Sequence, residues 1–172
     1  FNRKGASTFS GRIGEQVAQA AQTLGARILV WGREGSQQKA RDHGWAVAAS
    51  REAFFSQADV LSILVRLTPQ THGMVTAQDL ARMKPDAILV NTARAELIEP
   101  GALVTALRQG RPGFAAVDVY DQEPVLATRH PLQDLPNCLC TPHLGFVERD
   151  NYESYLGQAF DHINRYGASG AA

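Results

Sequence analysis

Short apolar runs alternate with longer amphipathic segments along most of the chain. Five runs are apolar almost without interruption, a pattern typical of strands that are covered on both faces of a sheet. Continuous apolar runs of this length favour buried strands over strands with one face in water. These runs are 28–31, 60–65, 87–90, 114–117 and 138–140.

Between these runs, apolar residues recur at three- and four-residue spacing, as on one face of a helix. Helices are expected from Gly14 to Leu24, ended by Gly25, and from a capping Thr76 to Met83. Another begins at Pro100, and a long one covers Arg149 to Tyr166. Strands that alternate with helices predict an α/β fold with a doubly wound, mostly parallel sheet.

The stretch before the first helix departs from this pattern. Residues 2–8 read NRKGAST, without the apolar run that should precede a helix in such a fold. We therefore expect the sheet to lack its first strand. Residues 1–147 then form one domain that is incomplete at its N-terminus, and residues 148–172 form a terminal helix and tail.

Composition narrows the class of partner. The 172 residues are 44% hydrophobic, enough for a sizeable core, and 17 basic residues balance 17 acidic ones. No overall field favours nucleic acid or an anionic membrane surface, and no apolar run approaches the roughly 20 residues of a membrane span. We expect a cytoplasmic protein with a small-molecule partner, no nucleic acid and no membrane.

Cys138 and Cys140 raise the question of a metal site or a disulfide, because His143 lies close behind them. We expect the two cysteines to point to opposite sides of their strand, so that they neither pair nor ligate one ion. With no fourth ligand nearby, we predict no metal site. The histidines at positions 43, 72, 130 and 162 lack paired spacing, and we expect them on the surface.

A glycine-rich segment precedes the first predicted helix. In FSGRIGEQVAQ, Gly11 and Gly14 fit the last two glycines of a dinucleotide-binding turn, whose backbone and helix N-terminus hold a pyrophosphate, with Arg12 and Ile13 between them. Phe9 stands where the first glycine is expected. Either the turn binds a dinucleotide in spite of Phe9, or Phe9 blocks it and the chain is a remnant that binds nothing.

The residue after the second strand bears on the choice of cofactor. An acidic side chain there would bind the adenosine ribose of NAD, but Gly32 and Arg33 occupy the position. Arg33 could bind the 2′-phosphate of NADP, whereas Glu34 next to it leaves NAD open. The cofactor is NAD or NADP, with a slight preference for NADP.

Three ionisable residues follow three predicted strands. Arg94 follows residues 87–90, Glu123 follows 114–117, and His143 follows 138–140. Carboxyl ends of parallel strands meet at one sheet edge, where ligands bind in open α/β folds. A guanidinium that holds a carboxylate, a histidine that donates a proton and a carboxylate that orients this histidine suit the reduction of a 2-oxo acid.

The segments LTPQTHGMVTAQDLARMKPDAILVNTARAELIEPGALVTAL, AAVDVYDQEP and TPHLGF resemble the nucleotide-binding domain of the D-isomer-specific 2-hydroxyacid dehydrogenases. The resemblance implies a Rossmann-like domain of an NAD(P)-dependent oxidoreductase that is a homodimer. It implies that Arg94 binds the substrate carboxylate and carbonyl, that His143 is the acid/base and that Glu123 is its partner. Residues implied near the nicotinamide are Thr92, Ala93, Asp118 and Gly145.

The same resemblance implies a substrate lobe made from a segment before the nucleotide domain and from the chain's end. We therefore expect the separate lobe to be absent, the sequence to be a fragment and the terminal helix to return to that lobe. An alternative function remains open, because some members of this family resemble transcriptional corepressors. In that case the chain is a non-catalytic, dinucleotide-sensing interaction module.

Overall fold

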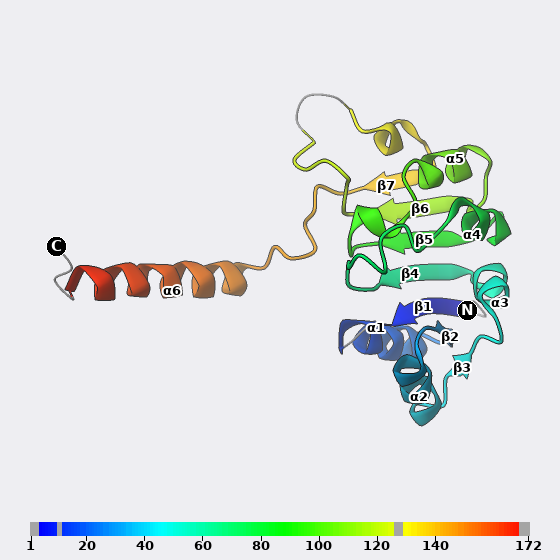
Figure 1. Cartoon of the computed structure of the whole chain (residues 1–172), viewed down its shortest axis with the longest axis horizontal. Coiled ribbons are helices and arrows are strands. Elements are labelled where there is room, and N and C mark those ends of the chain that lie inside the picture. The colour runs from blue at the N-terminus through cyan, green and yellow to red at the C-terminus, as the bar shows by residue number, and fades with distance from the viewer. Residues whose placement is uncertain (1–3, 10–11, 126–128, 169–172) are drawn as a thin grey trace. The chain divides into compact units, whose positions relative to one another are not determined.

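The computed structural model describes residues 4–9, 12–125 and 129–168. The chain divides into two compact units, residues 1–142 and 143–172. The first unit holds a seven-stranded sheet in the order β3-β2-β1-β4-β5-β6-β7, with every pair parallel (Figure 1). Its strands are β1 Lys4–Phe9, β2 Arg27–Trp31, β3 Ala46–Val47, β4 Val60–Leu64, β5 Ile88–Asn91, β6 Phe114–Val117 and β7 Cys138–Cys140.

The strand order reverses between β1 and β4, which lie side by side although two strands separate them in sequence. This reversal is the topological switch point of a doubly wound fold, and it confirms the predicted α/β class. The connecting helices are α1 Arg12–Thr23, α2 Glu34–Asp42, α3 Arg51–Gln57, α4 Ala77–Arg82 and α5 Ala102–Arg108, with 3-10 turns η1 Ala95–Leu97 and η2 Pro131–Asp134.

The prediction that the first strand is missing is wrong. Residues Lys4–Phe9 form β1, which pairs with β2 on one side and β4 on the other, near the middle of the sheet. Backbone groups make the hydrogen bonds of a parallel ladder, so a strand that neighbours pair on both sides does not need an apolar sequence. The hydrophobic pattern therefore could not reveal KGASTF as a strand.

The predicted helix starts depend on their caps. Thr76 forms a full capping box with Asp79 at the start of α4, as its sequence position indicates. The helix expected from Pro100 begins two residues later, because Gly101 is the N-cap with a φ of 74°. A left-handed backbone suits glycine, so the Pro-Gly pair forms the turn before the helix.

Two apolar clusters of unequal size make the core. The larger cluster joins α3, α4 and α5 to β4, β5 and β6, and it includes fully buried Phe54, Leu61 and Leu89. The smaller one lies between α1, α2 and β2 and consists of Ala18, Ile28, Val30, Ala40 and Trp45. Complete burial of one large apolar side chain contributes about 1.5–3 kcal/mol, so the larger cluster dominates the stability of the sheet.

The expectation that Cys138 and Cys140 point to opposite sides is wrong. Residues two apart on a strand share a face, and here the two Sγ atoms are 3.7 Å apart. Both are free thiols. Burial first, and then the neighbouring Cys140, raise the pKa of Cys138 to about 12, so this thiol is protonated at neutral pH.

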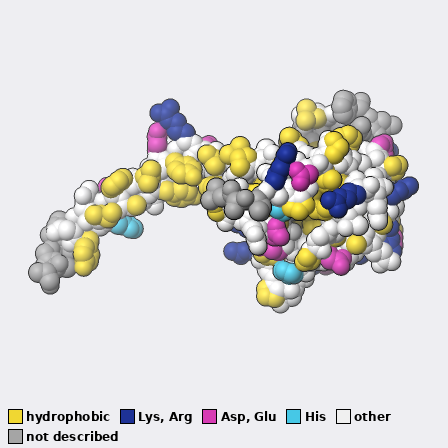
Figure 2. Space-filling view, turned by 90° about the horizontal axis from the view of Figure 1, so that it is seen from above, with side chains coloured by type: hydrophobic (Ala, Val, Ile, Leu, Met, Phe, Trp, Pro, Cys, Tyr) yellow, Lys and Arg dark blue, Asp and Glu magenta, His cyan; other side chains and the backbone are white. Residues whose placement is uncertain are grey.

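The second unit contains α6 Arg149–Ala168, close to the predicted Arg149 to Tyr166. The unit boundary falls before His143, whereas the sequence placed it after Val147. Within this unit no other helix or strand lies among the described residues, and the apolar stripe of α6 is exposed (Figure 2), including Tyr152, Tyr155, Leu156, Ile163 and Tyr166. Across the described ranges, no helix is both long enough and apolar enough to cross a membrane.

Candidate functional site

The carboxyl ends of β5 and β6 define the candidate site in the first unit. In the register of these strands, Asn91 at the end of β5 pairs with Val117 at the end of β6. Arg94 lies on the segment that follows β5 and Glu123 on the segment that follows β6, and these two strands are parallel neighbours. The segments that carry these two residues therefore leave the sheet from the same edge.

A buried asparagine shapes the turn that carries Arg94. The Asn91 side chain is 1% exposed; its Nδ2 donates to the Arg94 carbonyl over 2.9 Å, and its Oδ1 accepts from the Ala93 amide at 3.1 Å. The Arg94 side chain is exposed, and its Nη1 donates to the Ala93 carbonyl at 2.6 Å. A rigid turn thus presents a guanidinium whose planar donor fork can bind a carboxylate.

The Glu123 carboxylate is held by the backbone of its own turn. Its Oε1 accepts from the Tyr120 amide at 2.8 Å. Glu123 itself is exposed at the surface, while Tyr120 is 8% exposed and belongs to the larger core cluster. A carboxylate that rests on a buried residue's amide has a defined position, although water reaches it.

Polar side chains also join the ends of β6 and β7. Thr141 donates its hydroxyl to Asp118 Oδ1 at 2.5 Å and its amide to the Val117 carbonyl at 3.0 Å. The Tyr120 hydroxyl donates to the Thr141 carbonyl at 2.9 Å, and burial is the main cause that raises the pKa of this hydroxyl. Asp118 is only 5% exposed, so its carboxylate is fixed as part of the edge.

His143 is the first residue of the second unit and follows β7 by three residues. Its φ is 55°, which makes it the non-glycine residue with a left-handed backbone in the described part of the chain. Residues held in this region are uncommon and collect at functional sites. The imidazole packs edge-on against Phe146, with ring centroids 5.2 Å apart, and Gly145 between them is exposed.

The predicted dinucleotide turn is described only from Arg12 onward. Arg12 and Ile13 are exposed at the first turn of α1, and Gly14 is buried. Gly11 lies outside the described residues. A buried glycine in the first helical turn lets the helix pack closely, as the third glycine of a dinucleotide turn does, so this part of the motif fits the cofactor.

At the end of β2, Arg33 is the exposed N-cap residue of α2. The rival carboxylate, Glu34, is paired with Arg41 Nη1 at 2.8 Å. Thr92 and Ala93, predicted near the nicotinamide, precede Arg94 in the same turn. Thr92 is exposed and Ala93 is half-buried.

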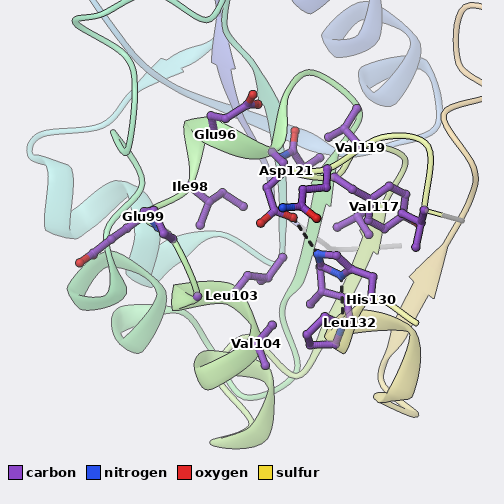
Figure 3. Close-up of a pocket in the computed structure, with 18 of the residues that line it drawn as sticks. Glu96, Ile98, Glu99, Leu103, Val104, Val117, Val119, Asp121, His130 and Leu132 are labelled. Carbon is purple, nitrogen blue, oxygen red and sulfur yellow. Dashed lines mark hydrogen bonds and ion pairs between the residues drawn. The ribbon is translucent and has the colours of Figure 1, made fainter. Parts of the chain in front are cut away.

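A cavity of about 520 Å³ lies in the first unit, next to the turn that carries Glu123 (Figure 3). Its lining includes Leu103 and Val104 of α5, Val117 of β6, and residues 119–122, 124–125 and 129–132. Much of the lining is apolar, and His130 stands at its edge with Asp121 and Leu132 as hydrogen-bond partners. His130, which we expected on the surface, is half-buried, with its side chain 17% exposed.

Sequence reasoning missed three residues of this edge. Asn91 closes the Arg94 turn, Thr141 fastens β7 to Asp118, and Tyr120 joins Glu123 to Thr141. Asn91 and Thr141 carried a usable signal, since each is a polar residue directly after an apolar strand. Within residues 4–9, 12–125 and 129–168, no group of three or more His, Cys, Asp or Glu side chains is arranged to hold a metal ion.

Comparison with known proteins gives these features a family context. The family model described as "D-isomer specific 2-hydroxyacid dehydrogenase, NAD binding domain" matches residues 9–145. A glyoxylate reductase of Aeropyrum pernix is 38% identical over 140 residues, which are 81% of this chain and 41% of that protein.

Similar solved structures carry names from the same family. The structure of a D-3-phosphoglycerate dehydrogenase oxidoreductase from Ralstonia solanacearum superposes with a TM-score of 0.90 at 47% identity, over 99% of this chain and 49% of that one. A D-isomer specific 2-hydroxyacid dehydrogenase from Xanthobacter autotrophicus, in complex with NADPH and MES, has a TM-score of 0.71 at 27% identity and covers 83% of this chain and 44% of that one. The chain spans between 24% and 47% of the first curated relatives that it matches.

Proposed function

Because the chain belongs to the D-isomer specific 2-hydroxyacid dehydrogenase family, through its NAD-binding domain, we propose that its protein reduces a small 2-oxo acid to the 2-hydroxy acid. A bound nicotinamide would supply hydride to the carbonyl carbon, and the chain's own residues would supply a proton to the carbonyl oxygen. The reverse reaction oxidises the 2-hydroxy acid. The observation that carries the proposal is the edge where Arg94 and Glu123 leave neighbouring parallel strands on turns fixed by Asn91 and Tyr120.

The chain's residues then have distinct roles. Arg94 binds the substrate carboxylate through its exposed guanidinium and polarises the carbonyl oxygen. His143 donates the proton to that oxygen, and Glu123 orients the imidazole. The dinucleotide supplies the hydride when it is bound.

Cofactor binding is assigned to both ends of the nucleotide. Gly11 and the first turn of α1, with Arg12, Ile13 and Gly14, would hold the pyrophosphate. Thr92, Ala93, Asp118 and Gly145 are assigned to the nicotinamide side. The homodimer and the cytoplasmic location stay proposals that rest on family resemblance.

Turnover on a panel of 2-oxo acids, glyoxylate and hydroxypyruvate included, tests the assignment in the native polypeptide at its full length. We expect His143→Ala to lower kcat by about 10²- to 10⁴-fold, the usual contribution of a positioned acid/base. His162→Ala, which changes an exposed histidine on α6, serves as the matched control and should leave kcat unchanged.

Two outcomes would change the conclusion. Full activity in His143→Ala would remove the proton-transfer role. Tight dinucleotide binding by the wild type, with no turnover on the panel, would instead favour the non-catalytic sensing module.

We further propose that the chain prefers NADP to NAD. Arg33 is exposed at the end of β2, where a ribose-binding acid would otherwise stand, and Glu34 is already paired with Arg41. We expect Arg33→Ala to weaken NADPH binding about 10- to 100-fold, the range for a lost charge-assisted hydrogen bond to a phosphate, and to leave NADH binding nearly unchanged.

Fluorescence titration of both dinucleotides measures this difference. Arg27→Ala is the matched control, because Arg27 is an exposed arginine at the opposite, amino end of β2. Equal weakening of NADH and NADPH in Arg33→Ala would contradict a 2′-phosphate contact.

A further inference from the structure

His130 has both ring nitrogens engaged at the end of the segment that carries Glu123. Its Nε2 lies 3.0 Å from Asp121 Oδ1, and its Nδ1 accepts from the Leu132 amide at 3.2 Å (Figure 3). The ring also packs edge-on against Tyr120, with centroids 5.1 Å apart. One imidazole therefore touches both ends of the segment that leads from β6 to η2.

The contacts define the tautomer of the neutral ring. A backbone N–H can only donate, so Nδ1 must present its lone pair to the Leu132 amide. The neutral ring then carries its proton on Nε2 and donates it to the Asp121 carboxylate. The two hydrogen bonds set the orientation of the imidazole, and the packing against Tyr120 restricts its tilt.

Asp121 and Tyr120 are also the residues that present Glu123. The Tyr120 amide donates to Glu123 Oε1 at 2.8 Å, and Asp121 follows Tyr120 directly. The Asp121 side chain is 71% exposed, so its pair with His130 adds little to global stability. Its main physical effect is to hold the turn from Tyr120 to Glu123 against η2.

We infer that His130 is a positioning residue for the Glu123 carboxylate, acting through Asp121 and Tyr120. This inference rests on the proposed function, in which Glu123 orients His143. Without the His130 contact the exposed part of the turn, from Asp121 to Glu123, can move away from η2. Tyr120 stays anchored in the core, but the Glu123 carboxylate on its amide is held less closely. The cofactor site at α1 and β2 is built from other segments and does not depend on this turn.

Two substitutions separate the ring's two contacts. His130→Gln can place an amide donor near the position of Nε2 and keep the Asp121 contact. His130→Asn can place an acceptor near the position of Nδ1, which keeps the Leu132 contact and loses Asp121. In the native polypeptide at full length, we expect His130→Asn to lower kcat about tenfold, the order of one lost hydrogen bond to a charged group, with the KM for NAD(P)H unchanged. His130→Gln should retain most of the activity.

Double mutants give a readout that a merely structural role would not move. If His130 acts only through the Glu123 carboxylate, His130→Asn should lower kcat in the wild-type background and add no further loss in a Glu123→Gln background. His130→Gln should match the kcat of the parent protein in both backgrounds.

Urea unfolding of each variant separates positioning from folding. A wild-type kcat in His130→Asn, while Glu123→Gln is slow, would overturn the inference and leave the proposed function standing, and so would fully additive losses in the double mutant. A wild-type kcat in Glu123→Gln itself would remove the role of Glu123, and both proposals would fall together. The inference would also be overturned if both His130 variants lost kcat in proportion to their loss of stability.

Discussion

The two halves of the sheet are fastened in different ways. The half formed by β1, β2 and β3 packs on a small cluster, and its polar contacts lie mostly near the surface, such as the His43–Glu15 pair at 2.8 Å. The half formed by β4 to β7 packs on the large cluster and also buries Asp79, Asn91 and Asp118. Polar groups are costly to bury unless they are hydrogen-bonded.

This difference shows where the fold fixes positions closely. Each of the three buried polar side chains is bonded to a turn or a helix start: Asp79 to Arg51 and Thr76, Asn91 to the Arg94 turn, and Asp118 to Thr141. A nucleotide platform needs mainly backbone amides, whereas proton transfer needs side chains held to a fraction of an ångström. The densely bonded half is the half to which we assign Arg94 and Glu123.

Among the substitutions that compare the two halves of the sheet, removal of the Asp79 carboxylate should cause the largest loss of stability. Its side chain is 3% exposed and accepts from Arg51 Nη2 at 2.6 Å and from the Thr76 amide at 2.9 Å. Asp79→Ala leaves a partly buried guanidinium unpaired and breaks the α4 cap, so we expect a loss of about 3 kcal/mol in the free energy of unfolding. Urea denaturation measures it. Glu15→Ala, which breaks surface pairs in the other half, is the control and should lose much less.

Acid tests the same carboxylate without a substitution. Burial alone would raise the pKa of Asp79, but hydrogen bonds from Arg51 and Thr76 outweigh it and hold this pKa below its usual value of 3.8. A lowered pKa stabilises the fold above the unfolded-state value, and this stability is lost as the pH falls through the folded-state value. The stability gap between wild type and Asp79→Ala should therefore narrow below about pH 4. A gap of the same size at pH 7 and pH 3 would contradict the pairing.

Substitution of two glycines by alanine should change stability by smaller amounts and with opposite signs. An added Cβ at Gly113, just before β6, would lie 1.9 Å from the Pro85 carbonyl oxygen, so Gly113→Ala should destabilise by about 2 kcal/mol. At Gly35, in α2 of the other half, nothing lies within 4 Å of the added Cβ. Gly35→Ala should stabilise by about 0.5 kcal/mol, because alanine favours a helix. Thermal melts of both variants measure the sign of each change in stability. A change of the same sign in both would contradict the difference in packing between the two halves.

Most of the densely packed half was predictable from the sequence. Strands 114–117 and 138–140 are observed with the bounds that the apolar pattern predicts, and Thr76 caps α4 as its position indicates. Buried strands and capped helices leave strong local signals because hydrophobic burial and orphan amides act on neighbouring residues.

What the sequence did not reveal depends on contacts between distant residues. β1 was missed because two neighbouring strands hold it in the sheet, and the cysteines were placed on the wrong faces although their two-residue spacing puts them together. His130 looked like a surface histidine because its partners, Asp121 and Leu132, form no recognisable motif with it. Its partial burial follows from contacts with Tyr120, Asp121 and Leu132, which only the fold brings together.

Chemical rescue tests the central claim most directly. With the native polypeptide at full length, the reduction of a 2-oxo acid by His143→Ala should be slow, and added imidazole should restore part of the rate in proportion to its concentration. Arg94→Ala should be slow and should not respond to imidazole, because it lacks the carboxylate-binding group rather than the proton donor. A His143→Ala enzyme that turns over at the wild-type rate without imidazole would contradict the account.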